Sequence, residues 1–511
     1  MCRKKIASFA ILGVVAIAAM LFFLFCYPYH FFHREQFSLF LSSEEFVRQM
    51  FSQGVYCGRA WLPTIVGGYL SQFYYYVGGG PVIVAVVLLL IGLVVRHALR
   101  KLGCDWRLAV GIAVVVMVWE AGRQSVGEYP LASSLSLLIG AGLACAYPIG
   151  RSEGWRFVAA IVTCALCVTS VGYGGIVAVA YIAVAEGIRR SWLLAALGVV
   201  AAIFVPHEKF AGGCWIGIPN MTAERVLRID VRTFWKKEIA KEEFTPNVRN
   251  NQIANCLYTL SQIKKEGDAA LDDIDWSCTQ LFIPVDETGN YMTITAAGEV
   301  WYAIGDMTMA EHATILGMIF SPWHSGARHL MRMAELNIIR GDEPAAAKYL
   351  QMLSHNVAHS KWADARKRAH RTAAYMEKVK SRQAYAPTTD TLRMASDYAR
   401  SLRNILNSNQ HNDMARTYLL ALDMQNRSMA DFVEDYIRYG RGVMTRSYAE
   451  ALMVVGATAP ADVRKRLSDV DIPMDVVRDF GRFNKLMANK DIESLKREYR
   501  GSYWWYCQTG K

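Results

Sequence analysis

The first 205 residues consist mainly of long apolar runs separated by short polar loops. The first run, residues 6–26, holds about 20 apolar residues, enough to cross a hydrocarbon core roughly 30 Å thick. Basic residues precede this run, and an aromatic segment follows it. A signal peptide would have a small-residue cleavage site at that position, so the run is predicted to be an uncleaved anchor. Six further runs predict spans at 80–95, 108–122, 131–149, 157–172, 174–187 and 192–205.

The basic residues of this region indicate how the spans are oriented. Most of its 15 Lys and Arg residues fall on one set of alternate segments. These are Arg3, Lys4 and Lys5, then Arg96, Arg100, Lys101 and Arg107, then Arg151 and Arg156, then Arg189 and Arg190. The positive-inside rule therefore predicts seven spans, with a cytoplasmic N-terminus and an extracytoplasmic C-terminal region.

One turn decides this orientation. Gly172-Tyr173-Gly174-Gly175 must form a tight hairpin between the fifth and sixth spans. If 157–187 were instead one long helix, the C-terminal region would be cytoplasmic and Arg189 and Arg190 would lie outside. The charge pattern favours the hairpin.

The first outer loop, residues 27–79, is longer than a simple connector. Ser42 and Glu45 have the spacing of a capping box, and 46–51 predicts a short amphipathic helix on the membrane surface. Aromatic residues between Trp61 and Tyr76 predict an interfacial belt. The loop is interpreted either as a lipid anchor or as a lid or substrate platform.

Beyond residue 206 helical periodicity replaces the long apolar runs, and a short motif recurs. Gly-Asp occurs at 267–268, 305–306 and 341–342, at intervals close to the roughly 34 residues of helix-turn-helix repeats. Ala310 and Ala346 each follow such a Gly by five residues, as small residues do where paired helices approach closely. These units look like irregular tetratricopeptide repeats and predict an α-solenoid.

The C-terminal part predicts a second helical region after a linker at about 380–391. Helices are expected at 392–405, 413–440, 446–456 and 473–500, and the aromatic segment Tyr503–Tyr506 is expected to pack back on the last helices. Strand-like alternation is weak and confined to 281–283 and 291–294. The predicted fold is therefore all-α. The predicted domains are a transmembrane bundle at 1–205, an extracytoplasmic repeat region at 206–385 and a second helical region at 386–511.

Composition agrees with this division. Apolar residues make up 53% of the chain and charged residues 20%, against typical values of roughly 45–50% and 25% for soluble proteins. The net charge of +11 divides into +7 for residues 1–205 and +4 for the remainder. Much of this basic charge serves as an orientation signal for the spans, so it does not indicate a nucleic-acid partner. The apolar runs exclude a purely soluble enzyme.

Cysteine and histidine patterns predict no metal site and no cofactor. Five of the 11 cysteines, an odd number, lie on the predicted extracytoplasmic side, which is not a disulfide framework. Cys164 and Cys167 have redox-motif spacing but lie within a span. His355 and His359 lack the Glu of a His-Glu-x-x-His motif and are interpreted as part of a solvated helix face, as is the basic stretch 361–371.

Carboxylates near the membrane are the candidate catalytic residues. Glu120 closes the third span, and an ionisable residue at membrane depth is a functional candidate because its burial is costly. The alternative is an interfacial ion pair with Arg123. Glu35 follows the first span, whereas Glu44 and Glu45 belong to the predicted capping segment. The candidate site residues are therefore Glu35 and Glu120.

The chain resembles a family of uncharacterised bacterial multipass membrane proteins in the segments Tyr27-Pro28-Tyr29-His30-Phe31-Phe32, Glu35-Gln36 and Leu70-x-Gln72-Phe73-Tyr74-Tyr75. The resemblance implies an N-terminal membrane region joined to a repeat-like helical region, with no established activity. More loosely, the layout is similar to integral-membrane polyprenyl-phosphate-sugar glycosyltransferases. That similarity implies a catalytic carboxylate, commonly Asp, in the first outer loop, where this chain has only Glu.

Two functions follow as hypotheses. The first is a membrane-anchored scaffold or assembly factor whose extracytoplasmic repeats bind a protein or peptide, with membrane lipid as its other partner. The alternative is a membrane glycosyltransferase that uses a lipid-linked sugar donor on the outer face, with Glu35 or Glu120 as the base.

Overall fold

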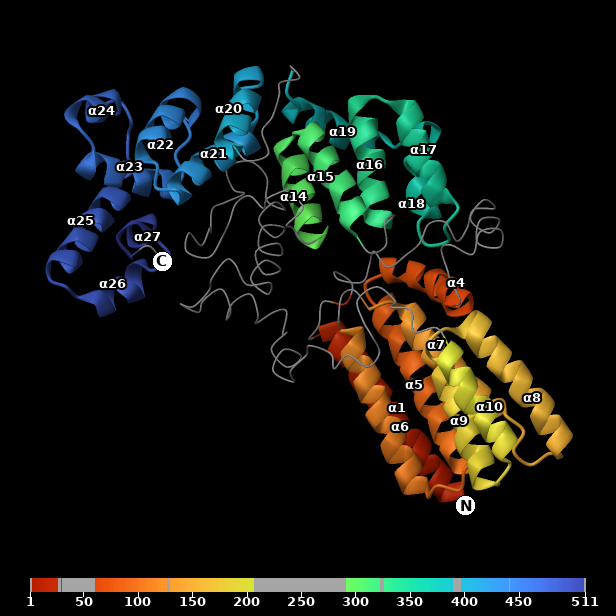
Figure 1. Ribbon diagram of the computed structural model, residues 1–511. Coiled ribbons are helices and arrows are strands. Elements are labelled where there is room, and N and C mark those ends of the chain that lie inside the picture. Colours follow the sequence, from red (N-terminus) through yellow and green to blue (C-terminus); the bar gives the residue numbers. More distant parts are fainter. Residues whose placement is uncertain are drawn as a thin grey trace. The chain divides into compact units, whose positions relative to one another are not determined.

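The computed structural model describes residues 2–25, 29, 60–125, 129–205, 291–321, 326–388, 397–440 and 442–509 (Figure 1). Within these residues every regular element is a helix, which confirms the all-α prediction. The weak strand-like alternation at 291–294 forms no strand, because these residues are the first turn of helix α14 (Tyr291–Ile304). The other such segment, 281–283, lies outside the described residues.

The described residues fall into two compact units. The first contains the N-terminal helices up to residue 205, together with 326–331 and 348–367. The second contains 291–321, 332–347 and the described residues from 368 to 509. The predicted domain boundaries at 205 and 385 stay predictions.

The long N-terminal helices form a bundle in which each helix runs opposite to the one before it along the chain, and α4 lies across one end (Figure 1). They are α1 (Cys2–Phe25), α4 (Trp61–Ser71), η3 (Gln72–Tyr75), α5 (Gly79–Lys101), α6 (Trp106–Gln124), α7 (Leu131–Ala146), α8 (Glu153–Leu166), η4 (Cys167–Val171), α9 (Gly175–Ile188) and α10 (Trp192–Phe204). Local sequence explains several starts. Pro81 lies in the first turn of α5, and the Asp105 side chain caps α6 by accepting a hydrogen bond from the Arg107 N–H at 2.9 Å.

Apolar residues occupy both the inner and the outer faces of these helices. Leu12 and Ile91 are fully buried, whereas Val115 and Leu193 are 67% and 75% exposed. A helix that is apolar on all sides needs an apolar surrounding. Three helical segments are long and apolar enough to cross a membrane, namely Ile6–Phe25, Gly79–Lys101 and Glu153–Val171, while α7, α9 and α10 are shorter apolar helices.

The glycine-rich turn separates two helices, so the single-helix alternative for 157–187 is wrong. The η4 segment ends at Val171, Gly172 has a φ of +79°, and α9 begins at Gly175. Gly174 is needed because a Cβ there would lie 2.2 Å from the Ser136 backbone. The chain reverses here, and α8 and α9 lie side by side (Figure 1).

The helices that follow residue 290 form helical repeats with a recurring turn. The helices α14 and α15 (Met307–Phe320) are joined by Gly305-Asp306, and α16 (Ala327–Arg340) and α17 (Glu343–Ser354) by Gly341-Asp342. Both glycines have positive φ, +94° and +82°. The Asp306 N–H donates to the Trp301 carbonyl and the Asp342 N–H to the Asn337 carbonyl, a Schellman arrangement.

Each Asp then caps the helix that follows. Asp306 Oδ1 accepts from the Met309 N–H at 3.1 Å, and Asp342 Oδ1 from the Ala345 N–H at 3.0 Å. Ala310 and Ala346 are fully buried, as the small-residue pattern predicts. The third Gly-Asp, at 267–268, lies outside the described residues.

Further helices follow α17 along the chain. They are α18 (Ser360–Asp364), η6 (Arg368–His370), α19 (Ala373–Tyr385), α20 (Tyr398–Ser408), α21 (Asp413–Gln425), α22 (Met429–Asp435), η7 (Tyr436–Gly440), α23 (Arg446–Thr458), α24 (Ala461–Arg466), α25 (Met474–Ala488), α26 (Ile492–Tyr499) and α27 (Tyr503–Thr509). Of these, α18 belongs to the first unit.

Three predictions in this region are wrong, and one of them is the helix expected at 473–500, which is divided into α25 and α26 at Lys490. The linker expected at 380–391 begins only after Tyr385, because Arg382 holds the end of α19 by donating to the Ala303 carbonyl at 3.2 Å. The expected helix 413–440 is divided at Arg427, which has a φ of +56°. A hydrogen bond from the Ser428 N–H to the Asp423 carbonyl there repeats the Schellman turn without a glycine.

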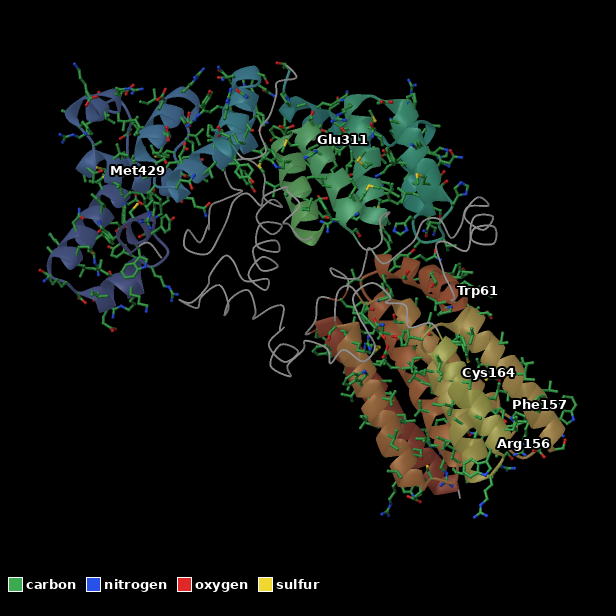
Figure 2. All side chains as sticks on the ribbon, in the orientation of Figure 1. Trp61, Arg156, Phe157, Cys164, Glu311 and Met429 are labelled. Carbon is green, nitrogen blue, oxygen red and sulfur yellow. The ribbon has the colours of Figure 1, made fainter. Side chains whose placement is uncertain are left out.

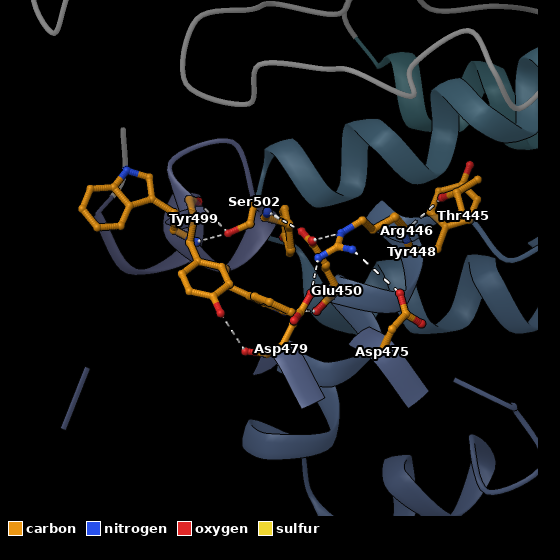
Figure 3. Close-up of polar contacts among 11 residues, drawn as sticks. Thr445, Arg446, Tyr448, Glu450, Asp475, Asp479, Tyr499 and Ser502 are labelled. Carbon is orange, nitrogen blue, oxygen red and sulfur yellow. Dashed lines mark hydrogen bonds and ion pairs between the residues drawn. The ribbon is translucent and has the colours of Figure 1, made fainter. Parts of the chain in front are cut away.

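The aromatic C-terminal segment packs back on the preceding helices, as predicted. Trp504 is 1% exposed, and its indole N–H donates to the Glu450 carbonyl at 2.9 Å. The Glu450 side chain accepts from the Tyr503 N–H at 2.7 Å and pairs with Arg446, which also contacts Asp479 at 2.7 Å (Figure 3). Burial raises the pKa of the Glu450 carboxyl. The helix α27 therefore closes this end of the unit.

Candidate functional site

Glu120 lies in a cluster of buried polar side chains within the bundle. Its Oε1 accepts hydrogen bonds from the Tyr129 hydroxyl at 2.8 Å and the Ser134 hydroxyl at 2.6 Å. The Arg123 guanidinium lies over the Tyr129 ring, 4.5 Å from its centroid, and its charge acts on the carboxylate. All four side chains are buried in an otherwise apolar bundle. Buried polar groups are stable there only because they satisfy one another.

Gln124, one turn after Glu120, extends the cluster to other helices. Its Oε1 accepts from the Tyr29 hydroxyl at 2.9 Å, and its amide N–H donates to the Ser134 hydroxyl at 2.7 Å. The Tyr29 hydroxyl also lies 3.2 Å from that of Tyr74 in η3. The amide thus connects residues that lie far apart in the sequence.

The glycine-rich hairpin completes the cluster. The Tyr173 hydroxyl lies 2.9 Å from the Tyr129 hydroxyl and donates to the Ser133 carbonyl at 2.9 Å. Ser136 ties the hairpin to α7, since its hydroxyl donates to the Val171 carbonyl at 2.6 Å and accepts from the Gly174 N–H at 2.9 Å. We call this set the Glu120 cluster: Tyr29, Tyr74, Glu120, Arg123, Gln124, Tyr129, Ser133, Ser134, Ser136 and Tyr173.

This arrangement supports either of two chemical roles. A buried carboxylate beside two hydroxyls can accept a proton, as a general base must. The same carboxylate can also serve only to hold the end of α6 to the start of α7, because its partners Tyr129 and Ser134 lie just before and within the first turn of α7. The predicted Glu120–Arg123 pair is therefore part of a larger network, and Glu120 as a catalytic residue stays a prediction.

Glu35, the other candidate, lies outside the described residues, as do Glu44 and Glu45. Sequence reasoning found Glu120 and Arg123 but missed Gln124, Tyr129 and Tyr173. A signal for the cluster was available at the start of the fourth apolar run, where three serines occur within four residues. Hydroxyls concentrated in an apolar helix indicate hydrogen bonding to a neighbouring helix.

A second buried polar group lies where α8 begins. Arg156 and Glu186 form an ion pair at 3.0 Å with side chains 8% and 0% exposed, and the Tyr147 hydroxyl donates to the Glu186 carboxylate at 2.9 Å. Arg156 and Trp61 of α4 lie at opposite ends of the bundle (Figure 2). The predicted cytoplasmic position of Arg156 thus coincides with a buried structural contact.

The histidine prediction is wrong in part. His355 and His359 do not share a helix face, because α17 ends at Ser354 and α18 begins at Ser360. Between them the Asn356 side chain accepts from the Ala358 N–H and stabilises a turn. His355 is exposed as expected, but His359 is 1% exposed.

Metal and thiol chemistry have little support in the described ranges. Within them there is no group of three or more His, Cys, Asp or Glu residues that could hold a metal ion. Cys164 and Cys167 are free thiols, as is Cys507, while Cys57, Cys214, Cys256 and Cys278 lie outside the described residues. In the basic stretch 361–371, Arg371 pairs with Glu343, and this contact lowers the pKa of the Glu343 carboxyl.

These features define a class of helical proteins in which an apolar bundle is followed by helical repeats. The chain belongs to a family of unknown function (DUF6057), whose model matches residues 3–220 and 191–510. No curated protein and no solved structure matches it.

Proposed function

We propose that the protein is a multipass inner-membrane scaffold or assembly factor. Its tetratricopeptide-like repeats lie on the periplasmic side and bind a protein or peptide partner. One observation carries this proposal, namely an exposed apolar stripe on a repeat helix. Ile315, Ile319 and Phe320 of α15 are 41%, 55% and 40% exposed, although α15 is not among the apolar helices that suit a membrane. An apolar stripe on such a helix favours a partner with a complementary apolar segment.

The repeat architecture supplies the rigid surface that such binding needs. Arg332 of α16 pairs with Glu299 of α14, and Arg340 of α16 pairs with Glu311 of α15. The Arg332 guanidinium also lies over the Tyr302 ring, 3.5 Å from its centroid. These contacts fix successive helix pairs, so the stripe is presented without the entropic cost of ordering it on binding.

The membrane arrangement supports the predicted periplasmic side. The described helices run in alternating directions, and basic residues lie in or beside the short turns that join α5 to α6, α7 to α8 and α9 to α10. With an N-terminus in the cytoplasm, the seven proposed spans deliver residue 206 to the periplasm.

The proposal is tested by complementing a deletion strain and by recovering crosslinked partners from membranes of the same cells. We expect Ile315→Glu combined with Ile319→Glu to abolish both complementation and partner recovery while the protein accumulates normally. The matched control, Met474→Glu combined with Ile492→Glu, changes side chains that are 72% and 64% exposed outside the stripe and should keep both. Equal behaviour of the two double variants would overturn the scaffold proposal.

The second candidate is the glycosyltransferase with a lipid-linked sugar donor. The buried Glu120 carboxylate beside two hydroxyls favours it, since such a group can act as a base. Glu120→Gln and Glu35→Gln distinguish the two functions, because the amide retains a hydrogen-bond acceptor but accepts no proton at neutral pH. The scaffold proposal expects both variants to complement fully. Loss of a surface glycan from a Glu120→Gln strain with normal protein levels would favour the enzyme.

A further inference from the structure

Two carboxyl groups are buried together in the second helical region. Asp423 of α21 and Asp435 of α22 are each 3% exposed. Arg403 of α20 holds Asp435, because its Nε donates to both carboxylate oxygens at 3.1 and 2.9 Å and its Nη2 lies 2.8 Å from Oδ2. The single guanidinium is therefore engaged with Asp435.

Asp423 is not held in the same way. Its Oδ2 is fully buried and has no hydrogen-bond partner among the described residues. A buried carboxylate oxygen without a donor is costly, whereas a protonated carboxyl can donate to the neighbouring carboxylate. The buried Asp435 carboxylate is the nearby negative charge that acts on Asp423.

The charges on the helices packed around the pair do not neutralise a second carboxylate. From α22, Asp431 adds a negative charge 3.7 Å from Arg403. From η7, Arg438 and the Tyr439 hydroxyl donate to the Asn407 side chain at 2.9 and 2.7 Å. From α14, Glu299 is paired with Arg332, and from α27 the Tyr503 hydroxyl donates to the Met424 carbonyl. If Asp423 and Asp435 were both ionised, their carboxylates and that of Asp431 would face the single Arg403 guanidinium. Neighbouring like charges resist simultaneous ionisation.

We propose that the Asp423 carboxyl carries a proton at neutral pH beside the Arg403–Asp435 ion pair, and that releasing it loosens the packing of α21 against α22. The pair is thus a pH-sensitive junction within the second helical region. Burial and the adjacent Asp435 carboxylate raise the pKa of Asp423 to about 8. Because this pKa lies above its value in the unfolded chain, the proton favours the folded junction. The stability of the junction therefore falls as the pH rises from about 4 to about 8, and levels off above that.

Hydrogen exchange of the full-length protein in detergent, measured between pH 6 and 9 and corrected for intrinsic exchange, tests this junction. For wild type we expect the opening constant of residues 413–435 to rise about tenfold per pH unit up to pH 8, relative to residues 446–458. In Asp423→Asn the amide donates permanently to Asp435, so this extra pH dependence should disappear. The control Asp413→Asn, on the same helix but with its side chain 46% exposed, should behave like wild type.

A second variant keeps the test decisive if Asp423→Asn does not fold. Asp435→Asn removes the repelling carboxylate and leaves Arg403 free to pair with Asp423, so the pH dependence should disappear here too. The proposal is overturned if wild type shows no pH-dependent opening between pH 6 and 8, or if both Asn variants keep it.

Discussion

At the scale of single residues, buried charges in the bundle are stabilising only as complete pairs. Arg156 and Glu186 lie 30 positions apart and meet because α8 and α9 fold against each other. The sequence placed Arg156 in a basic turn, and its partner could not be predicted because the pairing depends on helix packing. The same holds for Glu120, whose partners Tyr129 and Ser134 come from the loop and helix that follow.

We predict that Arg156→Ala lowers the free energy of unfolding by about 3–5 kcal/mol, because it leaves the Glu186 carboxylate buried and without its counter-ion. The matched control is Arg151→Ala, which removes an exposed arginine five residues earlier and should change stability by less than about 0.5 kcal/mol. Thermal unfolding of both variants in detergent measures the difference. Equal melting temperatures would show that the ion pair contributes nothing to the bundle.

At the scale of elements, the recurring turn shows what the sequence could and could not reveal. Gly305-Asp306 and Gly341-Asp342 were recognisable because glycine readily adopts positive φ and aspartate caps the next helix. The equivalent turns at Arg427 and Lys490 escaped detection, because there a non-glycine residue holds a φ of +56°. Both side chains are exposed and neither residue type marks a turn, so the local sequence carries no signal there.

The two glycines should differ in their tolerance of alanine. At Gly341 a Cβ would meet nothing within 4 Å, so Gly341→Ala should cost only about 1 kcal/mol for the positive φ. At Gly305 the Cβ would lie 2.6 Å from the Tyr385 Cβ and 2.7 Å from its carbonyl oxygen. Gly305→Ala should therefore cost a further 1–3 kcal/mol, about the usual penalty for overpacking. Denaturant unfolding of the two variants tests this order, and a smaller effect at Gly305 would contradict it.

At the scale of the whole molecule, the sequence was most informative about fold class. Long apolar runs and helical periodicity predicted an all-α chain with apolar helices followed by helical repeats, and both are present. The turn at 172–175 is a hairpin because Gly174 alone permits the contact with Ser136. The hairpin sets the number of chain reversals, and with it the side of the membrane on which the repeats are proposed to lie.

Reporter fusions after residues 190 and 511 test this central claim most directly. One set carries a phosphatase that is active only outside the cytoplasm, and the other a protein that fluoresces only inside it. We predict fluorescence and no phosphatase activity for the fusion after residue 190, and the reverse for the fusion after residue 511. Fluorescence without phosphatase activity at residue 511 would place the repeats in the cytoplasm and contradict the proposed periplasmic scaffold.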